Sequence, residues 1–326
     1  MLRIGIVGCG FMGGMHASVY RQLQACELVG VSDRNPERAA KFGREHGCPV
    51  FETQEALTEA VDAVDVCLPT DLHSDASVAA LAAGRHVFCE KPMALTLEEA
   101  DRMISAADAA GKQLMIGHCI RFWPEYALLK ETCDEGRLGG LASLNLTRYG
   151  AFPSWSAENW LADETRAGGG ALDMHIHDTD FALYLLGEPD SMTSRGTVDA
   201  RGVSQIFTTM MYGPTIVHLE GGWNLPAGTP FKMAFRAIFE HGAMIMDAGP
   251  LTVYEDGKEP IIPKFQSMKA EGGGNISDLG GYYHELSYFV EKVGNNEPLE
   301  TVTPQSSRLS LATALEEIRL AKAPVK

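Results

Sequence analysis

The sequence of 326 residues contains no apolar run of 18 residues or more, so we expect no membrane-spanning helix. Its first residues follow a strand pattern directly, without an apolar segment and a small-residue cleavage site, which favours a cytoplasmic protein over an exported one. Repeats and low-complexity tracts are also absent. These absences argue against a membrane-spanning, exported or repeat protein and indicate a globular protein, whose length is typical of two domains.

Basic residues are scarce, with 27 Lys and Arg against 43 Asp and Glu and a formal net charge of −16. Such an acidic surface repels phosphate backbones, so we expect no nucleic-acid partner. The seven cysteines all lie in the first 133 residues, and no two form a C-x-x-C pair. This distribution is typical of reduced thiols packed inside a cytosolic protein, although a catalytic cysteine is an alternative that it leaves open.

The first 120 residues alternate between strand and helix patterns. Short apolar stretches predict strands buried on both faces: Leu2–Val7, Leu28–Ser32, Val64–Leu68, His86–Cys89 and Leu114–Gly117. Helical patterns fall between them: Pro36–His46, Asp75–Ala83 and Leu97–Ala110, the last with a capping box of Thr96 and Glu99. Short loops between such elements predict a Rossmann domain, a doubly wound parallel sheet, over residues 1–120.

Residues 121–326 predict an α+β domain that binds the substrate and forms the oligomer contacts. Its largely antiparallel, open-faced sheet is predicted from a series of strand patterns joined by turn signals: Leu141–Tyr149, Ser204–Tyr212, Thr215–Gly221, Lys232–Glu240, Ala243–Asp247 and Leu251–Glu255. Helical patterns cover 171–186, 278–293 and 305–321, and the last helix could pack back on the first domain. Glu271–Asn275 predicts a mobile loop.

A glycine-rich turn follows the first predicted strand. Gly8-Cys9-Gly10-Phe11-Met12-Gly13 matches G-x-G-x-x-G and opens a helix, as dinucleotide binding requires. Gly8 would allow the tight turn, Gly10 the approach of a pyrophosphate, and Gly13 the close packing of helix and strand. The N–H groups and partial positive charge of the helix N-terminus would then bind that pyrophosphate.

Asp33 ends the second predicted strand, twenty residues after Gly13. A carboxylate there accepts hydrogen bonds from both ribose hydroxyls and repels a 2′-phosphate, so NAD is the predicted cofactor. Arg34 keeps NADP open, because its side chain could stack on adenine or bind that phosphate. The alternative is a structural glycine turn beside a surface Asp.

Ligands of open parallel sheets bind beyond the carboxyl ends of the strands. The polar residues expected at that edge are Pro69, Thr70, His73, Glu90, Lys91 and the segment His118–Arg121. Lys91 follows a buried strand and precedes a proline that fixes the turn, so its ammonium could donate to a substrate hydroxyl or to the nicotinamide ribose. The alternative is a solvated lysine paired with Glu90.

A second motif runs from Gly168 to Asp180. On a helix, Asp173, His177 and Asp180 would share one stripe, whereas His175 and Asp178 would point elsewhere. The two histidines are therefore poor co-ligands, and no metal is predicted. Histidine titrates near neutrality and suits the removal of a hydroxyl proton, although a structural histidine is the alternative.

Together these residues resemble the Gfo/Idh/MocA family, named after glucose–fructose oxidoreductase and inositol dehydrogenase. The resemblance covers nearly the whole chain. The stretches that carry it are the glycine motif, Cys67-Leu68-Pro69-Thr70-Asp71-Leu72-His73, Cys89-Glu90-Lys91-Pro92-Met93-Ala94, Arg121-Phe122-Trp123-Pro124-Glu125-Tyr126, the Gly-Gly-Gly…Asp-x-x-x-His stretch and Tyr283-His284-Glu285…Phe289.

The resemblance implies NAD(P)-dependent oxidation or reduction of a secondary alcohol of a sugar, inositol or related polyol. It implies a catalytic trio: His177 as general base, Lys91 holding the same oxygen, and Asp173 orienting Lys91 or the sugar. Pro69 and His73 would line the nicotinamide side. Candidate substrate contacts are Arg121, Trp123, Tyr149, Trp160 and Tyr283.

This chain departs from the family pattern at two positions. Family members usually have glycine where His175 stands and an apolar residue where Asp178 stands. His175 could narrow the pocket or serve a subunit contact, so the substrate does not transfer from the family.

Several alternatives stay open. One is a redox-neutral enzyme that uses the same hydride step transiently to eliminate a group from a sugar. Another is a non-catalytic sensor that binds NAD. Arg166 could bind an anionic substituent of the substrate. The resemblance also implies a homodimer or homotetramer that packs through the open face of the second sheet.

Overall fold

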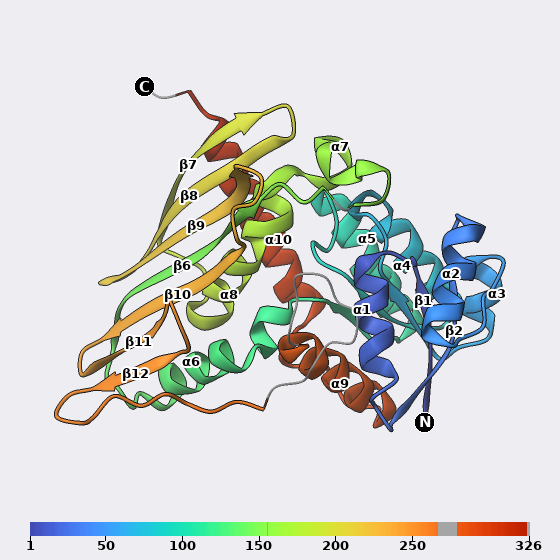
Figure 1. The fold of residues 1–326 in the computed structure, drawn as a ribbon, viewed down its shortest axis with the longest axis horizontal. Helices are drawn as coiled ribbons and strands as arrows, with labels where there is room; N and C mark the ends of the chain where they lie inside the picture. The colour runs from blue at the N-terminus through green and yellow to red at the C-terminus, as the bar shows by residue number, and fades with distance from the viewer. Residues whose placement is uncertain (155, 267–278, 325–326) are drawn as a thin grey trace. The chain divides into compact units, whose positions relative to one another are not determined.

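The computed structural model describes residues 1–154, 156–266 and 279–324, and it divides into two compact units (Figure 1). The first unit contains Met1–Phe122, Ser156–Glu158 and the described part of Ser267–Leu309. The rest of the chain forms the second unit. The predicted loop Glu271–Asn275 lies outside the described residues.

A five-stranded sheet organises the first unit. Its strand order is β2-β1-β3-β4-β5, and every described pair is parallel. The strands are β1 (Leu2–Val7), β2 (Cys26–Ser32), β3 (Ala63–Val66), β4 (His86–Cys89) and β5 (Leu114–Ile116). The order reverses between β1 and β3, which is the switch point at which such sheets bind ligands. This confirms the predicted doubly wound sheet.

Helices cover this sheet. They are α1 (Phe11–Tyr20), α2 (Pro36–His46), α3 (Gln54–Glu59), α4 (His73–Ala82), α5 (Leu97–Ala110) and α9 (Gly280–Gly294), with the short turns η1 (Thr70–Leu72) and η2 (Cys119–Phe122). Thr96 and Glu99 form the predicted capping box of α5. Helix α3, whose six residues carry little periodicity, was not predicted.

Helix α9 belongs to the first unit, although the sequence prediction placed all of 121–326 in the second. Its apolar side chains Leu286, Phe289 and Val290 are buried in the first core, and the helix packs against α1 (Figure 1). Helix α10 (Pro304–Lys322) begins in the first unit and ends in the second. The chain therefore returns to the first unit before it ends, because the apolar face of α9 completes that core.

The second unit has a seven-stranded sheet of order β12-β11-β10-β6-β9-β8-β7. The strands are β6 (Leu141–Ala151), β7 (Ser191–Asp199), β8 (Gly202–Tyr212), β9 (Thr215–Leu225), β10 (Lys232–Phe239), β11 (Gly242–Met246) and β12 (Thr252–Glu255). Within this second sheet, β6 and β9 are the only described neighbours that pair in parallel, so the predicted largely antiparallel sheet is confirmed. Strand β7, mostly exposed and polar, was not predicted.

The two faces of this sheet differ. Leu144, Leu146 and Leu219 are fully buried on one face. The remaining elements of the unit are α6 (Pro124–Glu135), η3 (Ala157–Ala162), α7 (Glu164–Ala167), η4 (Ala171–His175), α8 (Ile176–Leu186) and the second part of α10. Alternation within the strands leaves the side chains of Phe207, Ile216 and Ile238 exposed at 42%, 46% and 42%, respectively.

Candidate functional site

The glycine turn after β1 has the shape that a phosphate-binding turn needs. Gly8 has φ +106°, and a Cβ there would lie 2.4 Å from the carbonyl oxygen of Cys67. A Cβ on Gly13 would lie 2.2 Å from the carbonyl oxygen of Gly8, so helix α1 could not approach β1 as closely. A Cβ on Gly10 would meet nothing within 4 Å, which leaves open space above the turn.

The N-terminus of α1 faces this open space with its own backbone. Gly10 is the N-cap, no side chain caps the helix, and its first turn contains no acidic residue. Helix N-termini of this kind attract anions through their N–H groups and partial positive charge. Gly8, Gly10, Phe11, Met12 and Gly13 therefore fit the pyrophosphate of a dinucleotide.

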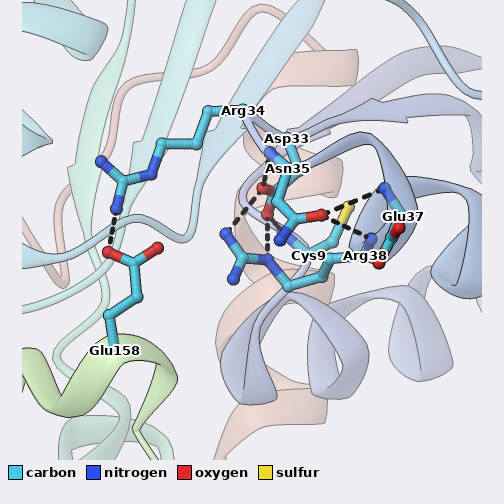
Figure 2. A network of polar contacts seen from close by, with 7 residues as sticks. All are labelled: Cys9, Asp33, Arg34, Asn35, Glu37, Arg38 and Glu158. Atoms are coloured by element: carbon cyan, nitrogen blue, oxygen red, sulfur yellow. Dashed lines mark hydrogen bonds and ion pairs between the residues drawn. The ribbon is translucent and has the colours of Figure 1, made fainter.

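The carboxylate of Asp33 lies at the end of β2, beside the glycine turn (Figure 2). Its Oδ2 accepts from the Cys9 N–H at 2.9 Å and from Arg38 Nε at 2.8 Å. Its Oδ1 accepts from Arg38 Nη2 at 2.7 Å and from the Asn35 N–H at 2.8 Å. Burial alone would raise the pKa of Asp33, but Arg38 and the Asn35 and Cys9 N–H groups lower it. Asp33 therefore stays ionised and ties the end of β2 to the glycine turn.

Two arginines near Asp33 have different roles. Arg38, in the first turn of α2, holds the carboxylate in the bidentate contact that Figure 2 shows. Arg34 points away from Asp33 and forms an ion pair with Glu158. Both partners of that pair are more than half exposed, at 61% and 53%, so a ligand can displace it at little cost. Arg38 was not predicted as a site residue, although its position five residues after Asp33 on a predicted helix was a usable signal.

The loop after β3 contains Pro69, Thr70 and His73. Pro69 is half-buried, whereas Thr70 is buried. The side chain of His73 is 1% exposed, and its Nδ1 and Nε2 each lie 2.8 Å from a backbone carbonyl oxygen, of Pro92 and Leu68. Both ring nitrogens of His73 therefore contact backbone, and the residue connects the loop after β3 to the turn after β4. That His73 lines the nicotinamide side stays a prediction.

The turn after β4 contains Glu90, Lys91 and Pro92, and the Lys91–Pro92 peptide bond is cis. Lys91 is half-buried, and its backbone N–H donates to Glu90 Oε2 at 3.1 Å. Glu90 is only 5% exposed, and its Oε1 lies 3.1 Å from Nε2 of His16. The Glu90 carboxylate thus joins His16 to the turn after β4, and its contact with the cofactor stays a prediction.

In the second unit, the predicted helix begins with a π-helical turn, Ala171–His175, and continues as α8. Hydrogen bonds in a π-turn join residues five apart instead of four, so residues on either side of it are rotated relative to an ideal α-helix. The shared face predicted for Asp173, His177 and Asp180 from α-helical spacing therefore does not apply across this turn. Asp173 and His177 are both half-buried. Asp180, predicted on their stripe, is fully buried and accepts from Ser310 Oγ at 2.7 Å.

His175 and Asp178, the two departures from the family pattern, are structural. Nε2 of His175 lies 3.0 Å from Glu317 Oε1, and both side chains are fully buried. A Cβ on Gly221 of β9 would lie 2.6 Å from the His175 ring, so glycine there provides the room for histidine. Asp178 accepts from Arg148 at 3.0 and 3.2 Å. His175 therefore fills the core instead of narrowing a pocket or meeting another subunit.

The five residues predicted to contact the substrate differ in how far their side chains are exposed. Arg121 is 5% exposed and donates through Nη1 to the Thr301 carbonyl at 2.7 Å, so we assign it to holding that loop. Trp123, the N-cap of α6, is half-buried. The other three are also half-buried: Tyr149 on β6, Trp160 on η3 and Tyr283 on α9.

The cysteine thiols are poor candidates for a catalytic nucleophile. None of the seven cysteines, all of them in the described residues, forms a disulfide. Burial raises the pKa of Cys9 to about 12 and the pKa of Cys26 and Cys133 to about 11. Thiols with such raised pKa values carry little thiolate at neutral pH, so they are poor nucleophiles.

Comparison with known proteins identifies the family to which both parts of the chain belong. Residues 2–118 match the model of an oxidoreductase family with an NAD-binding Rossmann fold, and residues 126–245 match the C-terminal domain of the Gfo/Idh/MocA proteins. The chain belongs to the Gfo/Idh/MocA family of oxidoreductases. NAD is therefore the cofactor of the first unit, in agreement with the glycine turn and with Asp33.

Curated relatives include sugar and polyol dehydrogenases. The chain is 34% identical over 200 residues to an inositol 2-dehydrogenase of Rhizobium meliloti, covering 60% of this chain and 59% of the relative. It is 35% identical over 191 residues to a myo-inositol 2-dehydrogenase of Thermotoga maritima, covering 57% and 55%. The chain thus matches somewhat more than half the length of these two relatives.

Solved structures match along nearly the whole chain. A UDP-N-acetylglucosamine 3-dehydrogenase from Acidithiobacillus ferrooxidans has a TM-score of 0.80 at 25% identity, covering 98% of each chain. A levoglucosan dehydrogenase in complex with NADH and levoglucosan has a TM-score of 0.85 at 22% identity, covering 98% of this chain and 97% of the other, which supports the fold alone. Among the described helices, none is long and apolar enough to span a membrane.

Proposed function

We propose that this protein transfers hydride between NAD and a secondary alcohol or ketone carbon of a sugar, an inositol or a related polyol. Membership of the Gfo/Idh/MocA oxidoreductases carries the proposal, together with relatives named as inositol dehydrogenases. We name the substrate by its class, because the relatives and solved structures above are named for an inositol, a UDP-sugar and levoglucosan.

The first unit would hold the cofactor. The backbone at Gly8–Gly13 would bind the pyrophosphate, and Asp33 would accept hydrogen bonds from the adenosine ribose. Asp33 already accepts four hydrogen bonds, so binding would shift Arg38 or share the carboxylate with it. Bound NAD would supply the hydride acceptor during oxidation. Pro69 and Thr70 would lie along the same edge of the sheet.

Three side chains would act on the substrate. His177 would take the proton of the reacting hydroxyl as its carbon loses hydride, and it would return that proton during reduction. Lys91 would donate a hydrogen bond to the same oxygen and stabilise the negative charge that develops on it. Asp173 would orient Lys91 or the sugar. The half-buried Trp123, Tyr149, Trp160 and Tyr283 would contact the ring or its hydroxyls, and Arg166 would bind an anionic substituent.

A substrate panel tests the proposal. The purified protein is incubated with NAD and each of myo-inositol, levoglucosan, glucose and glucose 6-phosphate, and NADH fluorescence is followed. We expect stoichiometric NADH with at least one compound, and NADH formation that is about 100-fold slower or more with the Lys91→Ala variant. Product formed without NADH would instead identify the redox-neutral elimination, and NAD binding without turnover of any sugar or polyol would identify a sensor.

We also propose that the protein is a cytoplasmic homo-oligomer. The cysteines without disulfides support a reducing compartment. The exposed Phe207, Ile216 and Ile238 on one face of the second sheet support a dimer or tetramer that covers this face. Light scattering tests the oligomer: Ile216→Asp should lower the measured mass, and an unchanged mass would exclude this face.

A further inference from the structure

Charged side chains lie in the interior of the first unit, where the sequence predicts only apolar packing. His16 on α1, Asp65 in the middle of β3 and Glu285 on α9 are fully buried, and Glu90 after β4 is 5% exposed. Ionisable groups are rarely buried unless they are paired. These groups come from four segments of the chain, and removing them from water costs free energy. Their burial together therefore needs a physical explanation.

His16 is the centre of the group. Its Nδ1 lies 2.8 Å from Asp65 Oδ2 and 3.2 Å from the sulfur of Cys67. Its Nε2 lies 3.1 Å from Glu90 Oε1. Burial alone would lower the pKa of His16, but Asp65 and Cys67 raise it well above its ordinary value. The ring is therefore an imidazolium between two carboxylates.

Glu285 closes the group from α9. One of its carboxylate oxygens lies within 4.8 Å of both His16 and Glu90, and among the described residues neither oxygen has a hydrogen-bond partner. Burial and the charges of Glu90 and Asp65 raise the pKa of Glu285 well above its ordinary value. A protonated Glu285 has one O–H to donate, and the Glu90 carboxylate, which lies 3.1 Å from His16 and within 4.8 Å of Glu285, is a buried acceptor beside it.

Aromatic rings keep water away from this group. The His16 ring meets Phe88 edge to face at 5.5 Å, and Phe88 meets Phe289 of α9 at 5.5 Å. The phenol of Tyr20 is also fully buried beside them, with its ring 6.5 Å from that of His16. In such a dry site, hydrogen bonds between ionised partners are strong and fix their geometry.

Glu90 transmits this geometry to the turn above it. Its Oε1 faces His16, and its Oε2 accepts from the backbone N–H of Lys91 at 3.1 Å. On the other side of the turn, the carbonyl of Pro92 lies 2.8 Å from the ring of His73. The backbone on both sides of the Lys91 side chain is therefore fixed by buried polar contacts.

We propose that His16 and Glu285 are positioning residues for Lys91, acting through Glu90. His16 holds the Glu90 carboxylate, through the 3.1 Å contact, in the orientation in which it binds the Lys91 N–H. Glu285, within 4.8 Å of both groups, closes the site from α9 and would donate its proton to Glu90 after a small side-chain rotation. Together they would fix the backbone position from which the Lys91 side chain extends. This inference rests on the proposed function of Lys91 as the group that holds the reacting oxygen.

The first test measures Lys91 directly and needs no substrate. Brief labelling of the full-length protein with acetic anhydride, followed by peptide mass spectrometry, gives the reactivity of Lys91 relative to Lys112, a lysine outside the cluster. We expect His16→Leu and Glu285→Leu to change this ratio by about three-fold or more, the effect of a half-unit change in the lysine pKa. Ratios equal to wild type in both variants would overturn the proposal.

Two conservative variants separate positioning from general damage. Glu285→Gln keeps a neutral group that can donate to Glu90, so we expect a wild-type ratio, whereas Glu285→Leu cannot donate. His46→Gln, on the outer helix α2, is the matched control for a histidine change and should leave the ratio unchanged. If Glu285→Gln disturbed Lys91 as much as Glu285→Leu, the proposed donation would be wrong. Glu90→Leu, which removes the acceptor of the Lys91 N–H, replaces His16→Leu if that variant does not fold, and a wild-type ratio in Glu90→Leu would also overturn the proposal.

Kinetics supply the second test once a substrate is found. We expect Glu285→Leu to lower kcat about 10- to 100-fold, the cost of a small misplacement of a reacting group, with the KM for NAD within two-fold of wild type. A larger KM for NAD with unchanged kcat would contradict a role through Lys91. If no sugar or polyol is oxidised, the proposed function fails while the labelling test of the cluster still stands.

A bound cation is the remaining explanation for His16, Glu90 and Glu285, whose ligand atoms lie within 4.8 Å of one another. Elemental analysis of the purified protein after dialysis against EDTA decides this. We expect no stoichiometric metal. Zinc retained at one equivalent by wild type and lost in Glu285→Gln would overturn the proposal.

Discussion

Replacing Glu285 by Gln tests the protonation of the buried cluster through protein stability. A group whose pKa is raised in the folded state adds stability below its unfolded pKa, and this contribution is lost as the pH rises toward the folded pKa. Burial, Glu90 and Asp65 raise the pKa of Glu285, so the wild type should lose stability with rising pH relative to Glu285→Gln.

The magnitude follows from one proton. An unfolded Glu has a pKa of about 4.3, and each pH unit between that value and the folded pKa costs about 1.4 kcal/mol. The difference in unfolding free energy between Glu285→Gln and wild type should therefore grow by up to about 1.4 kcal/mol per pH unit above pH 5. The other groups that face His16 and Glu285 are present in both proteins, namely Tyr20, Asp65, Cys67 and Glu90. While Glu285 is protonated, they face a neutral side chain in both proteins, so they contribute little to the difference.

Urea unfolding at pH 5, 6, 7 and 8, followed by tryptophan fluorescence and by circular dichroism, measures this difference. A constant offset between the proteins reports the packing of the amide and does not bear on the prediction, which concerns the slope. Glu59→Gln, an exposed change in the same unit, is the matched control. Parallel stability curves, or a variant that loses stability relative to wild type as the pH rises, would show that Glu285 is not protonated in the folded protein and would refute the reasoning.

Three further predictions follow from the structure. Asp33→Ala should raise the Kd for NAD about 10-fold or more, through the loss of charged hydrogen bonds, and weaken discrimination against NADP; fluorescence titration with both cofactors measures this, and an unchanged preference would exclude Asp33. Lys91→Ala and His177→Ala should each lower kcat about 100-fold or more while NAD still binds, and near-normal turnover in both would remove the assignment. Arg148→Met should destabilise the protein by about 3–5 kcal/mol, because it leaves the buried Asp178 without its ion-pair partner. Adding Asp178→Leu should recover much of that loss in urea unfolding, and a double variant no more stable than Arg148→Met would contradict this.

Much of the first unit could be predicted because its signals are local. The bounds of Leu2–Val7, His86–Cys89, Pro36–His46 and Leu97–Ala110 are the predicted ones, since proline, glycine and capping residues define their ends. The glycine turn was predictable for the same reason. Its function depends on backbone shape, and the sequence pattern dictates that shape.

The cluster around His16 was not predicted, because it depends on contacts between distant segments. Asp65 was the available signal, since a charged residue between Val64 and Val66 in a strand buried on both faces requires a partner. Its partners come from a helix near the start of the chain and, in Glu285, from a helix near its end. No local pattern indicates that α9 returns to the first unit.

The motif Gly168–Asp180 illustrates a different limit. Its helical character was predicted, but its π-turn was not, because a change of hydrogen-bond spacing has no periodic signature. The interior roles of His175 and Asp178 likewise depend on Glu317 and Arg148, which lie far along the chain. Glycine at position 221 in β9 was a weak sign that a large side chain packs against that strand.

A crystal structure with NAD and an oxidised polyol, trapped by His177→Asn, tests the central claim most directly. We expect Lys91 Nζ and the side chain at position 177 each to lie within about 2.6–3.2 Å of the same substrate oxygen. A complex in which the two side chains contact different parts of the substrate, or in which only one contacts it, would contradict the proposed mechanism.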